Sequence, residues 1–533
     1  MGTYLNPNNE NFRLQIATGT YIDKTMLIAQ TNKRVNDIDF KFVCVSRPRR
    51  FGKSLTVSTF KALFSGRREL FEGLAIDKTD WRWEKYPIIH FEFNDLTTTS
   101  VEEFERSLAW HVERKLAEAG YAYNKELTPA DNFGMAIDVL AVQKDDNGND
   151  AHTGVVILID EYDAPVGHCL DDVAKAEAVR ERLSVVYSQM KNRTGDIRFL
   201  FMTGVSKFTK LSVFSALNNI VDLSQDDTYA TMFGYTEEEL SANFEEHLRA
   251  HAAKMGKSYE DYRAEMKRWY NGFRFAKSDP TTVYNPISVA YTLVKKEPAF
   301  TATWATTGRP SMLMNYLKRE DVLRIDVERL RGVAEAEFDV AELRHLRPVA
   351  MLYQSGYLTI RDYDPLKQLY TLGVPDEEVR RDLCTLMTGV AADRDVQWAA
   401  SLGGKLLAEM WDDFFEGLQS LYARMAYGST ERRVHENSYG RCLAFLLASQ
   451  GFRFTMENVQ SNGRADVVAE HPALVCIFEL KVDEPVDRAF AQIRRKKYAE
   501  PFVADGRPIW LIGLSFDSQT RHLVDCAAEP FGR

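Results

Sequence analysis

The chain has 533 residues, which is more than one hydrophobic core normally supports, so we expect two or three domains. Its hydrophobic content of 45% is that of an ordinary globular protein, and its formal net charge of −10 excludes a protein that coats nucleic acid over its whole surface. The six cysteines form no C-x-x-C pair, and the sequence has no run of eighteen apolar residues and no apolar leader. These features predict reduced thiols, a cytoplasmic location and no membrane span.

The first informative segment is the apolar run 42–45, which predicts a buried strand. A loop and the triplet Gly52-Lys53-Ser54 follow it, at the start of a helical pattern. Backbone N–H groups there can surround phosphate oxygens, Lys53 can reach the β- and γ-phosphates, and the Ser54 hydroxyl can ligate Mg²⁺. The usual pattern G-x-x-x-x-G-K-[ST] has its first glycine where this chain has Arg47, so the turn has to form without it. The predicted nucleotide-binding residues of this segment are Arg49, Arg50, Phe51, Gly52, Lys53, Ser54 and Leu55.

A second apolar run, 155–159, predicts another buried strand and ends on the paired carboxylates Asp160 and Glu161. We expect Asp160 to bind Mg²⁺ together with Ser54, and Glu161 to polarise the attacking water. Paired acids after a strand can also be a solvated helix cap, but the Gly-Lys-Ser triplet upstream favours the nucleotide site.

A third strand is predicted over 199–202, and it ends at Thr203-Gly204-Val205-Ser206. Thr203, which we include among the nucleotide-binding residues, and Ser206 are candidates for sensing the γ-phosphate. An ordinary turn at Gly204 is the alternative. Lys207 and Arg274 are two further cations that could contact phosphate.

The middle of the chain reads as mainly helical. From 235 to 270, caps at Thr236 and Ser258 precede acids and apolar residues at helical spacing, which predicts a lid near the nucleotide. Residues 347–383 predict a helix, a hairpin with its turn at 362–365, and a second helix, as in a winged-helix element that either contacts DNA or packs on the rest of the protein. Residues 395–430 predict one connecting amphipathic helix.

Several of these segments together resemble a known family. They are YIDKT from Tyr21, SRPRRFGKSL, LIDEYDAPV, TGVSKF, and WYNGFRF with VYNP. Over residues 3 to 290 they resemble the predicted AAA-type ATPases, in which the form of the loop without the first glycine is the norm. The resemblance implies an ATP-binding P-loop domain and implies no particular cellular role.

The C-terminal region carries a different pattern, D-x12-E-x-K, on two predicted strands. Asp466 and Glu479 can converge on a divalent metal, and Lys481 shares the face of Glu479 because side chains alternate along a strand. Such a metal can activate water and stabilise charge at phosphorus, which is the chemistry of phosphodiester cleavage. A solvated Glu and Lys pair on a strand is the alternative.

Two further residues fit a catalytic pattern of this kind. Glu436 lies at a predicted helix about thirty residues before Asp466, and Gln492 shares a helix face with Arg495 and Lys496. The basic run 494–497 either grips a phosphate backbone or is a solvated helix face. Residues 425 to 530 resemble the PD-(D/E)XK nuclease superfamily, which implies a catalytic set of Glu436, Asp466, Glu479, Lys481 and Gln492 with Mg²⁺ or Mn²⁺.

The sequence thus predicts an α/β protein of three parts. A P-loop ATPase domain with its lid occupies 1–290, a helical and winged-helix-like region 291–424, and a restriction-endonuclease-like α/β domain 425–533. The predicted function is ATP binding and hydrolysis coupled to metal-dependent cleavage of DNA or RNA. The alternative is a nucleotide-dependent switch whose nuclease-like domain is not catalytic. ATP and a nucleic acid are the expected partners, no membrane is expected, and a homo-oligomer is left open.

Overall fold

The computed structural model describes residues 10–36, 41–144, 150–207, 220–304, 327–339, 343, 347–392, 396–427, 436–460, 463–520 and 522–532. The chain divides into two compact units. The first comprises Met1–Thr301 and Val327–Asp376, and the second comprises Ala302–Asp326 and Glu377–Arg533. Residues 291–424, which the sequence suggested as a region of their own, are distributed over both units.

The first unit is built on a parallel sheet with the strand order β2-β5-β6-β1-β7. The runs predicted as strands at 42–45, 155–159 and 199–202 are confirmed and extend slightly further. All three are buried along most of their length, as expected for parallel strands that are covered on both faces. The bounds are β1 Phe42–Ser46, β2 Ile88–Glu92, β5 Val155–Asp160, β6 Ile197–Gly204 and β7 Val221–Asp222.

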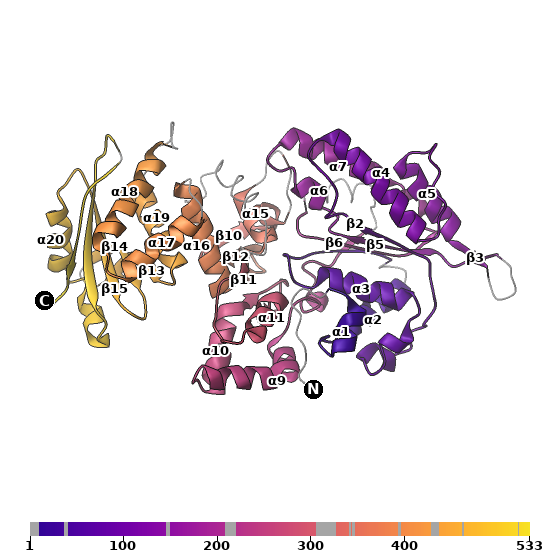
Figure 1. Cartoon of the computed structure of the whole chain (residues 1–533), viewed down its shortest axis with the longest axis horizontal. Helices are drawn as coiled ribbons and strands as arrows, with labels where there is room; N and C mark the ends of the chain where they lie inside the picture. The colour runs from indigo at the N-terminus through magenta and orange to yellow at the C-terminus, as the bar shows by residue number, and fades with distance from the viewer. Residues whose placement is uncertain are drawn as a thin grey trace. The chain divides into compact units, whose positions relative to one another are not determined.

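Helices cover both faces of this sheet (Figure 1). One layer contains α4 to α7, and the other contains α1 to α3. The bounds are α1 Phe12–Thr18, α2 Thr25–Asn36, α3 Lys53–Phe64, α4 Val101–Glu118, α5 Pro129–Leu140, α6 Ala164–Gly167 and α7 Val173–Ser188. A small hairpin of β3 Val142–Lys144 and β4 Asp150–His152 follows α5. Because β6 lies between β1 and β5, the carboxyl ends of all three strands meet at one edge of the sheet.

A buried histidine of the α4 layer makes the stability of this unit depend on pH. His111 packs beside Phe91 and Phe93, and burial lowers its pKa to about 4. The unfolded chain therefore binds a proton more tightly than the folded chain, and stability is lost as pH falls from about 6.5 through 4. The free energy of unfolding should therefore fall between pH 7.5 and pH 4.5. We expect His111→Phe to make this fall smaller by on the order of 2 kcal/mol. Urea unfolding at pH 7.5 and 4.5 would measure it, and an unchanged difference between the two pH values would contradict the assignment.

The predicted lid is a helical subdomain of the same unit. Its elements are α9 Glu237–Lys254, α10 Tyr259–Tyr270, β8 Asn271–Phe273, β9 Val283–Tyr284 and α11 Pro286–Val294. Thr236 caps α9 in a full capping box and Ser258 caps α10, which confirms both predicted caps. Ile22 of the YIDKT segment is buried in the core of this subdomain, and Lys24 forms an ion pair with Glu239 of α9 at 2.6 Å. The YIDKT segment therefore fastens the lid to the rest of the unit.

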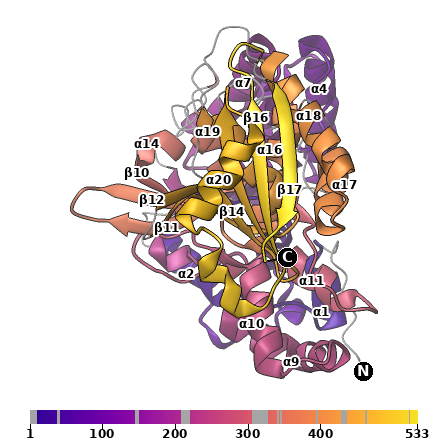
Figure 2. The ribbon, with the colours of Figure 1, turned by 90° about the vertical axis from the view of Figure 1, so that its left-hand side faces the viewer.

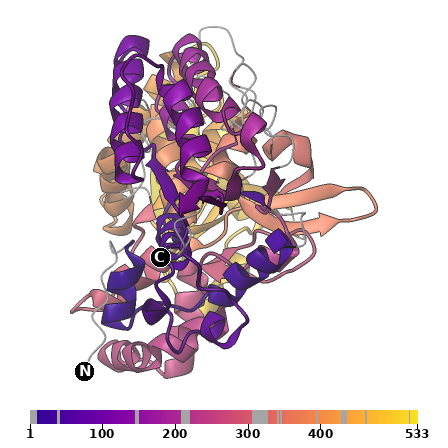
Figure 3. The same cartoon turned by 90° about the vertical axis from the view of Figure 1, so that its right-hand side faces the viewer.

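A small antiparallel sheet of order β10-β12-β11 completes the first unit. Its strands are β10 Leu330–Ala334, β11 Thr359–Asp364 and β12 Leu369–Gly373, with α14 Glu335–Phe338 and α15 Pro348–Gln354 beside them. The hairpin of β11 and β12 extends away from the rest of the unit (Figures 2 and 3). Its turn lies at 365–368 and not at 362–365, because strand pairing continues to Asp364 opposite Leu369. A winged helix is not confirmed, since the helix that follows, α16 Glu377–Ala392, belongs to the second unit.

The second unit packs helices on a five-stranded mixed sheet of order β13-β14-β15-β16-β17. Its helices are α16, α17 Val396–Leu407, α18 Trp411–Tyr427, α19 Glu436–Ser449 and α20 Val486–Lys496. Its strands are β13 Arg453–Gln460, β14 Gly463–Glu470, β15 Val475–Val482, β16 Ile509–Phe516 and β17 Leu523–Pro530. Figure 2 shows α20 lying across one face of the sheet. The single helix predicted over 395–430 is wrong, because the chain leaves the helix at Glu409, which has a left-handed φ of 56°.

None of the described helices combines the length and apolar character that a membrane span requires. All six cysteines are free thiols; five are buried and Cys526 is half-buried.

Candidate functional sites

The phosphate-binding loop lies between β1 and α3, as the sequence predicts. Gly52 stands before the first residue of α3 with a left-handed φ of 87°, and no side chain caps the helix there. A Cβ atom at Gly52 would have no neighbour within 4 Å, so the space over the helix start is open. Uncapped N–H groups at a helix start, beneath open space, suit the oxygens of a phosphate chain.

Lys53 is folded back onto this loop. Its Nζ donates to the carbonyls of Arg47 at 3.1 Å and Pro48 at 3.0 Å. Burial lowers the pKa of Lys53, while the nearby carboxylates of Glu161 and Asp160 act in the opposite direction. The ammonium is thus held close to the loop by weak neutral acceptors, which an anionic phosphate could replace.

The carboxylates Asp160 and Glu161 lie at the same edge of the sheet. Asp160 ends β5, and it accepts a hydrogen bond from the hydroxyl of Thr203 on the neighbouring strand β6. Thr203 in turn pairs in register with Val45 of β1, so it lies between the loop and Asp160. Burial raises the pKa of Glu161, and its φ of 51° is unusual for a residue other than glycine. Backbone strain of this kind accumulates at functional sites.

Asp163 is a residue of this site that the sequence reasoning missed. It is buried, and its carboxylate accepts the N–H groups of Val205 at 3.0 Å and Ser206 at 2.6 Å. The Ser206 hydroxyl also donates to Asp163, so Ser206 bonds inward. The Thr203 hydroxyl also bonds within the protein, to Asp160. The third acid of the segment DEYD was the available sequence signal.

Gly204 is required where β6 passes this cluster. A Cβ atom there would lie 2.5 Å from both Asp163 Oδ1 and the Tyr162 ring, closer than side chains tolerate. We expect Gly204→Ala to destabilise the first unit by about 3 kcal/mol, because the Asp163 carboxylate or the ring must move. Thermal unfolding would show it. Gly167→Ala is the control because its Cβ would meet nothing within 4 Å, and equal effects of the two substitutions would contradict this account.

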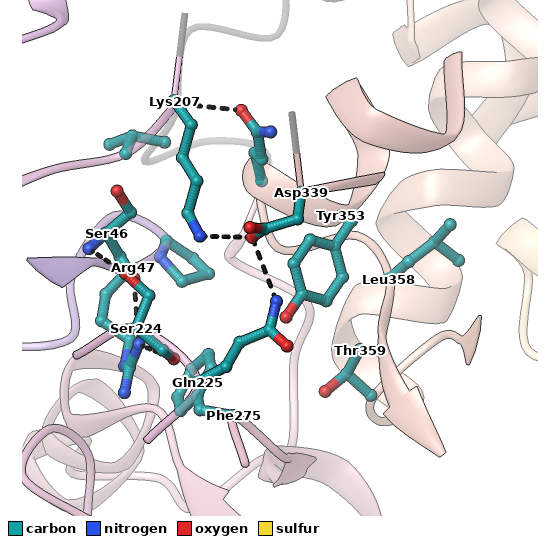
Figure 4. Close-up of a pocket in the computed structure, with 13 residues that line it drawn as sticks. Ser46, Arg47, Lys207, Ser224, Gln225, Phe275, Asp339, Tyr353, Leu358 and Thr359 are labelled. Atoms are coloured by element: carbon teal, nitrogen blue, oxygen red, sulfur yellow. Dashed lines mark hydrogen bonds and ion pairs between the residues drawn. The ribbon is translucent and has the colours of Figure 1, made fainter. Parts of the chain in front are cut away.

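Lys207 and Arg274, the two further cations suggested by the sequence, bond within the protein. Lys207 is buried and reaches Asp222 at 3.0 Å and also Asp339 (Figure 4). Gln225 donates to Asp339 at 3.0 Å in the same pocket. The guanidinium of Arg274 donates to the backbone carbonyls of Ala276 and Asp279. Both cations therefore have partners within the protein, which favours a structural role for each.

A separate pocket adjoins the outer side of the loop. It lies among the YIDKT segment, the first two turns of α3, and residues 232–235 before α9. Gly52, Leu55 and Thr56 form its wall on the side of the phosphate loop. Its walls mix apolar and polar side chains, as pockets for flat organic ligands commonly do.

The second unit brings Asp466, Glu479 and Lys481 together. Val467 of β14 pairs with Phe478 of β15, so Asp466 and Glu479 are the next residues along the two strands. The Asp466 carboxylate accepts the N–H of Leu480 at 2.7 Å, and Lys481 Nζ lies 2.8 Å from Glu479 Oε1. The three predicted side chains therefore form one cluster.

The electrostatics of this cluster suit a divalent cation. Burial, followed by repulsion from Asp466, raises the pKa of Glu479 to about 7. Within the described residues, the buried Glu479 Oε2 atom has no hydrogen-bond partner. A buried acid with an unused oxygen beside a second carboxylate is a disfavoured arrangement that a bound cation would relieve.

The remaining predicted residues lie on flanking helices. Glu436 begins α19, but its side chain lies outside the described residues. Gln492 is half-buried on α20, the helix that packs on β15 and β16. Of the basic run, Arg494 pairs with Glu529 at 2.5 Å and Lys497 with Glu500 at 2.8 Å. Among the described side chains, no group of three or more His, Cys, Asp or Glu residues is placed to hold a metal.

Comparisons with known proteins assign the phosphate-loop region and the C-terminal region to two different families. Residues 10–214 match a family model described as predicted AAA-ATPase, and residues 434–526 match one described as PD-(D/E)XK nuclease superfamily. The chain belongs to the predicted AAA-ATPases that carry a PD-(D/E)XK nuclease superfamily domain. A relative from Azotobacter chroococcum mcd 1 is 30% identical over 530 residues, which cover 96% of each chain. That relative is described as "Uncharacterized protein in vnfD 5′ region". No solved structure matches.

The two family assignments confirm the resemblances drawn from the sequence. The AAA-ATPase-like match covers the phosphate loop, Asp160, Glu161 and Thr203, and the nuclease-like match covers all five residues of the predicted C-terminal set.

Proposed function

We propose that the AAA-ATPase-like domain binds and hydrolyses ATP. The observation that carries this proposal is the arrangement around β6, where Thr203 lies between the uncapped start of α3 and Asp160. In this proposal Lys53 orients the β- and γ-phosphates, and the N–H groups of the 49–55 segment bind their oxygens. Ser54 and Asp160 would hold Mg²⁺, which supplies charge neutralisation when bound. Glu161 accepts a proton from the attacking water, a role that its burial and raised pKa favour.

We assign the nucleoside to the pocket beside Gly52, Leu55 and Thr56. The γ-phosphate has to point toward Glu161 for hydrolysis. The nucleoside, at the other end of the phosphate chain, therefore lies on the side of the loop that faces α3. A pocket around Lys207 also adjoins the loop, but Lys207 and Gln225 both donate to Asp339 there. This leaves the helix side as the better place for a base and ribose.

For the nuclease-like domain we propose metal-dependent cleavage of phosphodiesters in DNA or RNA. The carrying observation is the unpartnered Glu479 Oε2 beside Asp466. Asp466 and Glu479 would hold Mg²⁺ or Mn²⁺, with Glu436 as a further acid; the cation would activate water and offset charge at phosphorus. Lys481 stabilises developing negative charge, and Gln492 orients the substrate or Lys481. The chain would act in the cytoplasm.

A second candidate is a nucleotide-dependent switch whose nuclease-like domain binds a nucleic acid without cleaving it. Two observations favour this second candidate: the described side chains offer only two carboxylates at the cluster, and part of the basic run is neutralised by Glu529 and Glu500.

The β10–β12 sheet with α15 is proposed to act as a winged-helix-like packing element. Its hairpin cations, Arg361 and Lys367, bond to the Val374 carbonyl and to Asp364.

The test is a cleavage assay on labelled double-stranded DNA, single-stranded DNA and RNA, with Mg²⁺ or Mn²⁺ and with or without ATP. Phosphate release from ATP is measured in parallel. Metal-dependent cleavage together with ATP hydrolysis supports the full proposal. Hydrolysis without cleavage of any substrate favours the switch.

A further inference from the structure

Arg47 occupies the position of the missing first glycine, and it is buried inside the protein. Its guanidinium donates to the carbonyls of Ser224 at 2.7 Å and Ser46 at 3.0 Å. It also lies over the ring of Phe275, 4.2 Å from the ring centre, and 5.5 Å from that of Phe233. Figure 4 shows Arg47 beside Ser224 and Phe275. Burial lowers the pKa of Arg47 to about 10, so the side chain stays charged at neutral pH. A glycine at this position would make none of these contacts.

Residues 271–276, which comprise β8 and the three residues after it, also contact the other end of the loop. Phe51, which immediately precedes Gly52, packs edge-on against Phe273 at 4.8 Å and Phe275 at 5.2 Å between ring centres. Cation–π contacts with Arg and edge-to-face aromatic pairs both have preferred geometries, so they fix position as well as adding stability. The first residue of the loop and the residue before its glycine are therefore held by one aromatic surface.

Arg274, the residue between the two phenylalanines, fixes this segment in turn. Phe273 and Phe275 contact Phe51 of the loop, while Arg274 bonds to other parts of the unit. The Arg274 N–H donates to Thr359 of β11 at 2.8 Å, and the Thr359 hydroxyl donates back to the Arg274 carbonyl at 3.0 Å. At its start, the strand continues directly from α10 of the lid. Gly272 has no room for a side chain, because a Cβ atom would lie 1.9 Å from the Pro375 carbonyl oxygen.

We propose that residues 271–276 form a brace that sets the shape of the phosphate loop in place of the missing glycine. Arg47, Phe51 and Phe275 are its positioning residues. The brace makes the affinity for nucleotide depend on α10 and β11, which are continuous with it or bonded to it. This inference rests on the proposed ATP site and adds to it a role for the segments RPRRFGKS and NGFRF, which lie more than two hundred residues apart in the sequence.

The decisive variant is Arg47→Gly, which restores the ordinary loop pattern while removing the contacts with Ser224 and Phe275. If the loop folded by itself, this change would preserve or improve ATP binding. The brace predicts the opposite, a rise of at least tenfold in KM for ATP in the full chain. Phe275→Leu should act likewise, and Phe275→Tyr, which keeps the ring, should stay within threefold of the unmodified chain.

Phe133→Leu is the matched control, because Phe133 is a buried aromatic residue of α5 whose ring packs edge-on against Phe91. It should lower the melting temperature as much as Phe275→Leu and leave KM unchanged. ATP binding within threefold of the unmodified chain in Arg47→Gly would overturn the brace, as would equal KM changes in Phe133→Leu and Phe275→Leu. Failure of the unmodified chain to bind ATP would overturn the proposed function itself, and the brace with it.

Discussion

Replacing Lys53 with alanine should reduce the affinity for ATP on the order of 100-fold, because the ammonium lies against the phosphate loop and charge-assisted bonds to phosphate are strong. Lys53 donates to the carbonyls of Arg47 and Pro48, and its burial already lowers its pKa. Removing it should therefore leave the fold in place. Titration of a fluorescent ATP analogue would measure the affinity, with circular dichroism as the check on folding.

Lys61→Ala is the matched control, because Lys61 lies two turns further along α3 and is exposed. It removes the same charge from the same helix without touching the loop, so nucleotide affinity should stay within about twofold. If Lys53→Ala bound the analogue as tightly as Lys61→Ala does, the phosphate site would be wrongly placed. A loss of affinity in both variants would point instead to a general electrostatic effect of the helix.

The strands that carry the sites were predictable because their apolar runs are long and end in polar residues. The runs at 42–45 and 155–159 became β1 and β5, and the pair Asp466 and Glu479 met across β14 and β15 as the period of two requires. Helix caps such as Thr236 and Ser258 were equally predictable, since the cap and its acids lie within four residues. Predictions of this kind depend only on neighbours in sequence.

The features that escaped prediction all depend on contacts between distant segments. Asp163 bonds to Val205 and Ser206 some forty residues away, and the only sign of it in the sequence is its place as the third acid of DEYD, which does not predict those bonds. Lys207 pairs with Asp339 across more than a hundred residues. The hairpin turn was placed too early because Asp362 and Asp364 are turn formers by composition, yet cross-strand pairing holds both in β11.

Asp466→Asn should reduce metal-dependent phosphodiester cleavage on the order of 1,000-fold and leave ATP hydrolysis unchanged. Asparagine retains an oxygen that can accept the Leu480 N–H, which lies 2.7 Å from the aspartate, so β14 and β15 should stay paired. What it removes is the negative charge that, after burial, raises the pKa of Glu479. With that charge absent, Glu479 ionises more readily, but the site has lost one of its carboxylates, so its affinity for the cation falls.

Mn²⁺ binding without nucleotide, measured by calorimetry, gives a second readout that does not depend on the identity of the substrate. Asp525→Asn, an exposed carboxylate on the far edge strand β17, is the control and should behave as the unmodified chain. Cleavage that persisted in Asp466→Asn would show that it arises at another site. A third outcome is that the unmodified chain binds Mn²⁺ but cleaves no nucleic acid, and that Asp466→Asn no longer binds Mn²⁺. The domain would then hold a cation at this cluster without using it for hydrolysis, as the switch requires.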